Sequence, residues 1–230
     1  MVLTEDTPAQ NFAAQRARMV EEVDAMYAET RADTSLARMS PAVRVAMGKV
    51  ERHRLVPAGE AGRAYRNHPL PIGSGQTISQ PYIVALSTDL LNLVSGDVVL
   101  EVGTGSGYQA AILAEIAARV YSIELIEALG RTAAQRLEDM GYRNIEVKIG
   151  DGYKGWPEKA PFDAIVVTAA APEVPRALVE QLKPGGRMVI PVGPDGGMQH
   201  LRLIAKRPDG TLEERSVLAV RFVPLVPGKR

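Results

Sequence analysis

The chain has 230 residues, with 27 lysines and arginines against 27 aspartates and glutamates, so its formal net charge at pH 7 is zero. Proteins whose main partner is nucleic acid or an anionic membrane surface need a surplus of basic residues, and this balance argues against both classes. The chain has no cysteine, which excludes disulfide scaffolds, thiolate metal sites and a cysteine nucleophile. Its three histidines lack metal-ligand spacing, so no metal site is expected.

No stretch of the sequence approaches the ~20 apolar residues that a membrane span requires. The N-terminal segment MVLTEDTPAQNF is acidic and lacks the basic-then-apolar order of a signal peptide. We therefore expect a cytoplasmic protein with neither a membrane nor a nucleic-acid partner. We also expect it to be a monomer.

Residues 1–96 are expected to form a tail, a helical cap and a long loop. Residues 1–10 are polar and contain Pro8, which predicts a frayed tail. Apolar residues at helical spacing predict a helix over 11–30. Ser40 followed by Pro41 is typical of a helix start, with serine as the cap and proline at the first helical position. The other expected elements are a loop over 30–40, an ordered loop rich in proline and glycine over 53–72, and a helix over 82–93.

From residue 97 to residue 230 short apolar strands alternate with helices. Such alternation is typical of a parallel sheet with helices on both faces. The last two strands lie too close together for a helical crossover and should form an antiparallel edge. We expect an α/β fold, a doubly wound, mostly parallel Rossmann-like sheet with a helical N-terminal cap and an antiparallel C-terminal edge. The expected strands cover 98–102, 119–125, 144–151, 162–170, 187–193, 200–207 and 216–223, and the helices 107–118, 127–141 and 174–182.

A glycine-rich loop follows the first of these strands. Gly103, Gly105 and Gly107 end the strand and open a helix, and glycine there lets the chain turn sharply and a ligand approach closely. The spacing departs from the dinucleotide fingerprint, because Tyr108 stands where the third glycine belongs. Glu101 precedes the loop, and a buried carboxylate there repels a pyrophosphate but suits a ligand that carries an ammonium group. A tight turn without a ligand is the alternative interpretation.

Two later strand ends carry further acidic residues. Glu124 lies about 20 residues past the glycines, where a carboxylate can accept hydrogen bonds from ribose hydroxyls. Asp151 and Gly152 end the third strand, where an adenine would lie, although an ordinary Asp-Gly turn and a solvated carboxylate at Glu124 remain alternatives. Together the three strand ends predict a pocket for an adenosine-bearing cofactor without a pyrophosphate, a description that S-adenosylmethionine fits.

Several longer segments carry a family resemblance. They are RHRLVP at 52–57, Tyr65, HPLPIG at 68–73, GQTISQP at 75–81, EVGTGSGYQAA at 101–111 and AAAPEVPRALVEQLKPGGRMVIPVG at 169–193. From about Val50 to Val223 the chain resembles the protein-L-isoaspartate O-methyltransferases. GQTISQP is the most specific segment, because generic methyltransferases do not carry it. The resemblance implies the class I S-adenosylmethionine-dependent methyltransferase fold and places the long loop of residues 1–96 on the substrate side.

The resemblance also implies roles for individual residues. Ser79 matches the family's active-site serine, and Ile190, Pro191 and Val192 match a strand end near the substrate backbone. Gln199 matches a glutamine that closes the pocket. The residues that the resemblance and the motifs together assign to the cofactor are Gln76, Thr77, Ile78, Glu101, Gly103, Gly105, Ser106, Glu124, Leu125, Asp151, Gly152 and Gln199.

The implied reaction is methyl transfer from S-adenosylmethionine to the free carboxyl of L-isoaspartyl residues in damaged proteins and peptides. A carboxylate is ionised at neutral pH and needs no general base, which agrees with the absence of a His-Asp pair from the sequence. The Ser79 hydroxyl can donate a hydrogen bond that orients the carboxylate. Its alternative role is that of a helix cap ahead of Pro81.

Two rival functions stay open. One is a related carboxyl methyltransferase for a single dedicated peptide or small acid. The small Ser74 and the long stretch over 29–40 favour it. The other is a binding module that senses the cofactor without turnover, against which the intact GQTISQP segment argues. Turnover on a test peptide separates them.

Overall fold

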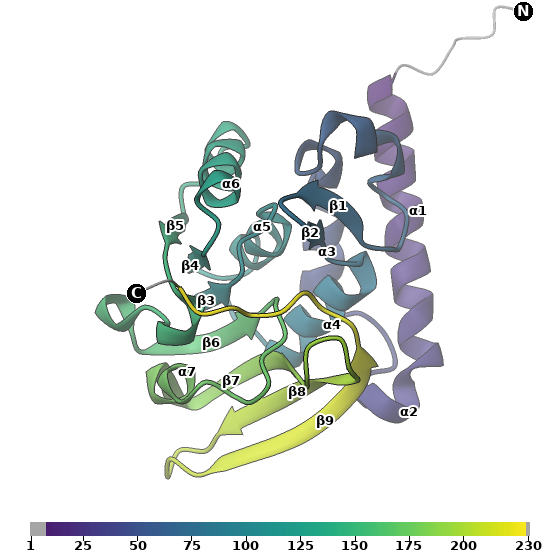
Figure 1. The fold of residues 1–230 in the computed structure, drawn as a ribbon. Coiled ribbons are helices and arrows are strands. Elements are labelled where there is room, and N and C mark those ends of the chain that lie inside the picture. Colours follow the sequence, from purple (N-terminus) through teal and green to yellow (C-terminus); the bar gives the residue numbers. More distant parts are fainter. Residues whose placement is uncertain (1–7, 229–230) are drawn as a thin grey trace, which may run out of the picture.

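A computed structural model describes residues 8–228, with side chains from Phe12 onward. Its centre is a seven-stranded sheet in the order β5-β4-β3-β6-β7-β8-β9 (Figure 1). Neighbouring strands are parallel except at β7–β8 and β8–β9, so the expected mostly parallel sheet with an antiparallel edge is confirmed. The strands are β3 (Val98–Val102), β4 (Arg119–Glu124), β5 (Ile145–Ile149), β6 (Phe162–Val167), β7 (Leu182–Val192), β8 (Gln199–Lys206) and β9 (Leu212–Val220).

Helices cover both faces of the sheet. Successive strand residues point to opposite faces, so in β3 Val99 joins the core beneath one set of helices while Leu100 joins the core on the other face. The first core also contains side chains from the N-terminal cap, so the parts before and after residue 97 pack together, and their division into two units stays a prediction. The helices on the first face are α4 (Pro81–Leu91), α5 (Tyr108–Ala114) and α6 (Glu127–Asp139), and α7 (Arg176–Gln181) lies on the second.

The N-terminal cap differs from expectation at two places. Helix α1 (Pro8–Glu29) begins inside the predicted tail, because proline is well suited to a first helical turn; residues 1–7 lie outside the described part. The predicted loop over 30–40 contains the short helix α2 (Arg31–Thr34), whose last carbonyls accept hydrogen bonds from Arg215. The start of α3 (Pro41–Lys49) is confirmed, since Ser40 Oγ accepts from the N–H of Val43 at 3.3 Å.

The predicted ordered loop over 53–72 holds more regular structure than expected. It contains two short 3₁₀ helices, η1 (Arg52–Arg54) and η2 (Ala58–Arg63), and strand β1 (Leu70–Gly73). Strand β1 pairs antiparallel with β2 (Gln76–Ile78), and the turn between them has positive φ at Ser74 and both flanking glycines. Strands of three or four residues carry too little periodicity to be recognised.

The ends of several strands also differ. Strand β7 begins at Leu182, so residues 183–186, which separate the predicted helix over 174–182 from the predicted strand over 187–193, run within it, and its pairing with β6 is irregular there. Strands β5 and β6 end before their predicted limits, because the chain turns away at their carboxyl ends to form the walls of a pocket.

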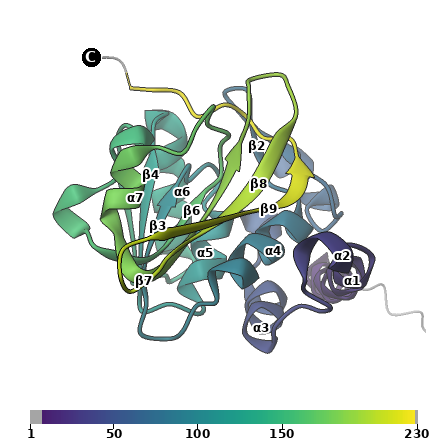
Figure 2. The same ribbon diagram turned by 90° about the horizontal axis from the view of Figure 1, so that it is seen from below.

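The C-terminal strap, which we define as residues 221–228, crosses the carboxyl edge of the sheet (Figures 1 and 2). Ala170 donates its N–H to Val223 O at 2.8 Å, and Leu225 donates to Ala170 O at 2.7 Å. The predicted last strand to residue 223 therefore ends at Val220, and its continuation covers the ends of β6 and β3. No helix in the described part of the chain has the length and apolar character needed to cross a membrane.

Candidate active site

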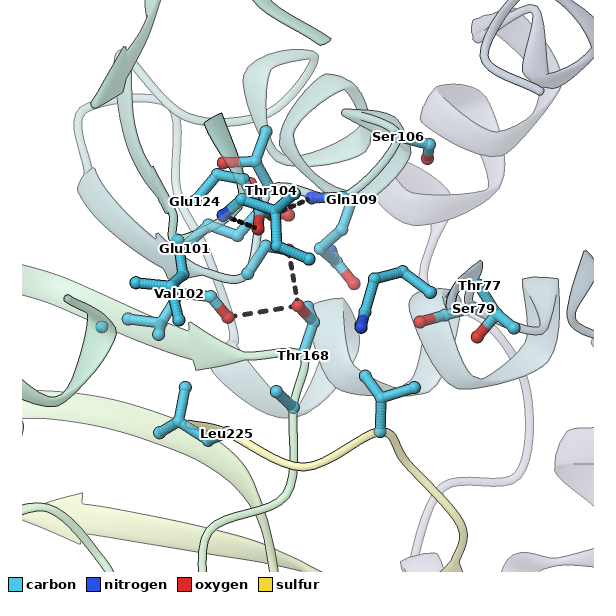
Figure 3. A pocket seen from close by; sticks show the side chains of 18 of the residues that line it. Thr77, Ser79, Glu101, Val102, Thr104, Ser106, Gln109, Glu124, Thr168 and Leu225 are labelled. Atoms are coloured by element: carbon cyan, nitrogen blue, oxygen red, sulfur yellow. Dashed lines mark hydrogen bonds between the residues drawn. The ribbon is translucent and has the colours of Figure 1, made fainter. Parts of the chain in front are cut away.

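A pocket opens at the carboxyl ends of β3, β4 and β6, beneath the C-terminal strap (Figure 3). This is the edge where doubly wound sheets bind their ligands. The space that protein atoms leave free in the pocket is about 810 Å³, a volume that includes the open solvent at its mouth. Figure 3 places Glu101, Thr104 and Glu124 on one side, Thr77 and Ser79 on the other, and Thr168 between them.

The glycine loop is shaped by close backbone contacts at Gly103. This residue has φ +101°, and a Cβ on it would lie 2.3 Å from Thr168 Oγ1, so no other residue fits. The Thr168 hydroxyl donates to Gly103 O at 2.6 Å. Thr168 comes from the end of β6, and this contact ties two neighbouring strand ends together around the pocket.

Glu124 holds the same loop from the other side. Its Oε2 accepts the N–H of Gly105 at 2.7 Å, and its Oε1 accepts the N–H of Ile126 at 2.9 Å. Each carboxylate oxygen has a second lone pair free to accept from a ligand. The side chain lines the pocket and is largely buried, so it can bind two hydroxyls while it anchors the loop.

Glu101 lies deeper, at the end of β3, and is fully buried. Its Oε2 accepts a hydrogen bond from Ser122 Oγ, which lies 2.5 Å from Thr104 Oγ1. Its Oε1 has no partner among the described residues, and burial raises the pKa of Glu101 to about 8. A buried acceptor without a donor is costly, so this oxygen suits the ammonium group of a ligand. The unpartnered oxygen of Glu101 therefore fits the ammonium group of S-adenosylmethionine.

Ser79 stands on the opposite wall, between β2 and α4. The helix cap of α4 is Gln80, and no side chain caps it, so the alternative in which Ser79 caps this helix is wrong. In the described part of the chain the Ser79 hydroxyl has no hydrogen-bond partner. It lines the pocket and is free to bind a substrate.

A second cavity, the outer groove, adjoins the pocket. It shares Thr77, Ser79, Thr168 and Val223 with the pocket and runs outward along the last residues of β9. Strand β9 is at the edge of the sheet, so one side of its backbone has no strand partner among residues 8–228. The residues that line the groove are Met26, Thr30, Pro69, Thr77, Ser79, Gln80, Tyr82, Ile83, Thr168, Leu218, Ala219, Val220, Arg221, Phe222 and Val223.

Most of the residues predicted for the site come together in the pocket. Sequence reasoning missed Thr168, Gln109 and the strap, although the rule that ligands bind at strand ends could have found Thr168. The predicted residues that line the pocket are Gln76, Thr77, Ile78, Ser79, Glu101, Gly103, Gly105, Ser106, Glu124, Leu125 and Gly152.

Five predicted residues do not line either cavity. Ile190, Pro191 and Val192 are buried within β7, where Ala171 pairs with the strand end and covers it. Gln199 exchanges two hydrogen bonds with the backbone of Phe222, so it holds the strap. Asp151 accepts the N–H of Tyr153 at 2.9 Å in a local turn.

The described residues contain no group of three or more acidic and histidine side chains that could hold a metal ion. The pocket therefore offers carboxylates, hydroxyls and backbone groups. Such a set can bind and orient a ligand and a second substrate.

Comparisons with known proteins identify the relatives of this chain. A family model described as Protein-L-isoaspartate(D-aspartate) O-methyltransferase (PCMT) matches residues 24–230. The chain is 58% identical over 215 residues to Protein-L-isoaspartate O-methyltransferase 1 of Cupriavidus necator, covering 94% of this chain and 83% of that relative. It is also 58% identical over 207 residues to Protein-L-isoaspartate O-methyltransferase 2 of Polaromonas sp., covering 90% of this chain and 98% of that relative.

Solved structures have the same fold. A protein-L-isoaspartate O-methyltransferase matches with a TM-score of 0.78 and 28% identity, over 91% of this chain and 65% of that one. A putative protein-L-isoaspartate O-methyltransferase from Plasmodium falciparum, solved in complex with S-adenosyl-L-homocysteine, matches with a TM-score of 0.73 and 24% identity over 92% of this chain and 98% of that one.

Proposed function

The chain belongs to the protein-L-isoaspartate(D-aspartate) O-methyltransferase family, and we propose that it methylates the free carboxyl of L-isoaspartyl residues in damaged proteins and peptides, with S-adenosylmethionine as methyl donor. The observation that carries this proposal is the position of Ser79. Its unpartnered hydroxyl lines both the inner pocket and the outer groove, at the boundary where a cofactor and a peptide would meet.

The inner pocket binds the cofactor in this proposal. S-adenosylmethionine supplies, when bound, an electrophilic methyl group on a sulfonium sulfur. Glu124 accepts the ribose hydroxyls while it holds Gly105. The free Oε1 of Glu101 accepts the ammonium group, and Gly152 and Leu125 line the adenine end.

The substrate side acts by alignment and desolvation. Ser79 donates one neutral hydrogen bond that orients the substrate carboxylate without stabilising its charge strongly in the ground state. Holding the reacting atoms in line can lower a barrier by roughly 7–11 kcal/mol. The strap covers part of the pocket and is held there by its backbone bonds to Ala170. No proton has to be removed, because the carboxylate is ionised at neutral pH.

The outer groove takes the peptide in place of the predicted contacts at Ile190, Pro191 and Val192. Its wall at residues 218–220 has a free backbone edge, which suits an extended main chain. Ser74, which pointed to a dedicated substrate, is exposed in the turn between β1 and β2 and lines neither cavity. The monomeric state, the cytoplasmic location and the lack of a nucleic-acid partner stay predictions.

A methyl-transfer assay on two versions of one peptide tests the proposal. The isoaspartyl carboxylate sits on a shorter arm than that of aspartate, and about 1 Å of misplacement can cost ~100-fold in rate. We expect efficient methylation of the isoaspartyl peptide and at least about 100-fold weaker activity on the aspartyl version. Equal rates would refute the repair function, and a protein that binds the cofactor without turnover would be a sensor.

A further inference from the structure

Arg52 is a buried arginine whose charge has no partner. It lies in η1 and is 0% exposed. Its Nε donates to Ala64 O at 2.8 Å, but both terminal nitrogens lack a hydrogen-bond partner among the described residues. No carboxylate of the described part lies within ion-pair distance of it. Burial lowers the pKa of Arg52 to about 10, so the guanidinium stays charged at neutral pH.

The guanidinium packs against the ring of a residue that lines the cofactor pocket. Its carbon lies 4.6 Å from the ring centre of Tyr108, and Tyr108 lines the pocket. A ring face attracts a cation, but a cation–π contact does not replace the hydrogen bonds and the counter-charge that a buried cation normally requires. A positive charge therefore lies against a pocket-lining residue, and neither of its terminal nitrogens has a hydrogen-bond partner among the described residues.

The pocket itself has the opposite balance. Its lining contains two carboxylates, Glu101 and Glu124, and no lysine, arginine or histidine among the described residues. The amino-acid end of S-adenosylmethionine carries an ammonium and a carboxylate. Glu101 suits the ammonium, but no cationic side chain among the described lining residues balances the carboxylate, and in a poorly solvated site the nearest buried charge acts with little screening.

We propose that Arg52 is a positioning residue for the cofactor, and that its charge acts through the pocket wall at Tyr108 to favour ligands with an amino-acid carboxylate. This inference rests on the proposed function. It assigns to Arg52 a selectivity for the carboxylate, beyond its packing against η2 and α5. Replacement of Arg52 by an apolar side chain removes an unpaired buried charge and also the hydrogen bond to Ala64 O, so the test measures ligand selectivity and not stability.

The test compares two ligands on the same protein by calorimetric titration. S-adenosylhomocysteine carries both charges, and its decarboxylated analogue 5′-(3-aminopropylthio)adenosine keeps only the ammonium. We expect the wild-type protein to bind the first at least about tenfold more tightly. In Arg52→Met this ratio of dissociation constants should fall about tenfold, whereas Arg52→Lys should keep it within about threefold. Arg54→Met, at an exposed arginine of the same short helix, is the matched control and should leave the ratio unchanged.

The ratio of two ligands on one sample does not depend on how much of the variant is folded. If Arg52→Met does not fold, Arg52→Gln carries the same comparison. A wild-type protein that binds both ligands equally overturns the proposal without any variant. Equal weakening of both ligands in Arg52→Met also overturns it, because Arg52 would then only support Tyr108. A wild-type protein that binds neither ligand contradicts the proposed function itself, so the two failures are distinguishable.

Discussion

Glu124 and Gly105 are joined by a 2.7 Å hydrogen bond from the loop N–H to a carboxylate oxygen. The bond connects the ends of β3 and β4, and it gives Glu124 two tasks. The carboxylate sets the shape of the glycine loop and, in the proposed function, accepts the ribose hydroxyls. Loop geometry and cofactor affinity should therefore respond together to changes at this position.

Replacement of Glu124 by alanine should weaken the binding of S-adenosylmethionine at least tenfold while the fold survives. Hydrogen bonds to a charged group contribute roughly 1.5–3 kcal/mol each, and the substitution also leaves the N–H groups of Gly105 and Ile126 without their acceptor. Calorimetric titration measures the affinity, and urea unfolding measures the stability. Glu127→Ala, at an exposed glutamate in the first turn of α6, is the control. Unchanged affinity in Glu124→Ala would show that Glu124 does not bind the ribose of the cofactor.

Cofactor binding should depend on pH through Glu101. Burial raises its pKa to about 8, so the ligand-free protein holds this carboxyl protonated at pH 7. A cationic ligand favours the carboxylate, and binding should release the proton. Affinity should therefore increase as the pH rises toward about 8, by at most about tenfold per pH unit, and level off above it. Calorimetry in two buffers of different ionisation enthalpy counts the released protons.

The stability of the ligand-free protein should show the opposite trend. The pKa of Glu101 is about 8 in the folded state and 4.5 in the absence of the fold. Between these two pH values the folded state therefore binds more protons than the unfolded chain. Stability should fall as the pH rises toward about 8, by at most about 1.4 kcal/mol per pH unit. Glu101→Gln cannot ionise and still accepts from Ser122, so both dependences should be reduced in this variant. Identical pH profiles for the two proteins would contradict the role of Glu101.

Ser79→Ala should slow methyl transfer and leave the affinity for the cofactor within about twofold. One neutral hydrogen bond contributes about 0.5–1.5 kcal/mol, so its loss predicts a decrease in rate of about 2- to 13-fold. Single-turnover rates on an isoaspartyl peptide measure the effect. Ser95→Ala, at an exposed serine before β3, controls for the loss of a hydroxyl elsewhere. A wild-type rate in Ser79→Ala would remove this residue from the mechanism.

The fold of the sheet could be predicted because its signal is local. The apolar runs of β3 and β6 and the glycines after β3 are contiguous in the sequence, and each indicates its element without knowledge of the rest. The cluster of Glu101, Gly103 and Glu124 followed directly, since parallel strands bring their carboxyl ends to one edge. Thr168 was missed because the predicted strand extended to residue 170, which placed it inside the sheet.

The remaining errors come from contacts that leave no pattern in the sequence. The strap is held by backbone bonds of Ala170, which any residue can make. Because the strap crosses the pocket, Gln199 binds the backbone of Phe222 and not a ligand. The course of the strap could not be predicted from strand periodicity. Ile190, Pro191 and Val192 are at a strand end as predicted, but the chain after β6 returns to pair with them at Ala171 and closes them off from substrate.

The outer groove should bind the main chain of its substrate and not particular side chains. The free edge of β9 at residues 218–220 offers backbone groups at strand spacing, and an extended peptide can pair with such an edge whatever its side chains. Isoaspartyl peptides with varied flanking residues should therefore have kcat/KM values within about tenfold of one another. A synthetic peptide that carries an N-methyl group on one backbone amide cannot donate the hydrogen bond from that amide. If the amide pairs with the edge of β9, kcat/KM should be lower by about 2- to 13-fold, the equivalent of one hydrogen bond.

A scan of single N-methylated positions along one isoaspartyl peptide separates main-chain from side-chain recognition. Amides that face β9 alternate along an extended strand with amides that face away, so the loss should alternate between neighbouring positions, and the unaffected positions are the internal controls. A folded, undamaged protein should be a poor substrate, because its segments cannot reach the groove in an extended form. Activity confined to one flanking sequence, with no alternation in the scan, would mean that side chains select the substrate, as expected of an enzyme for one dedicated peptide.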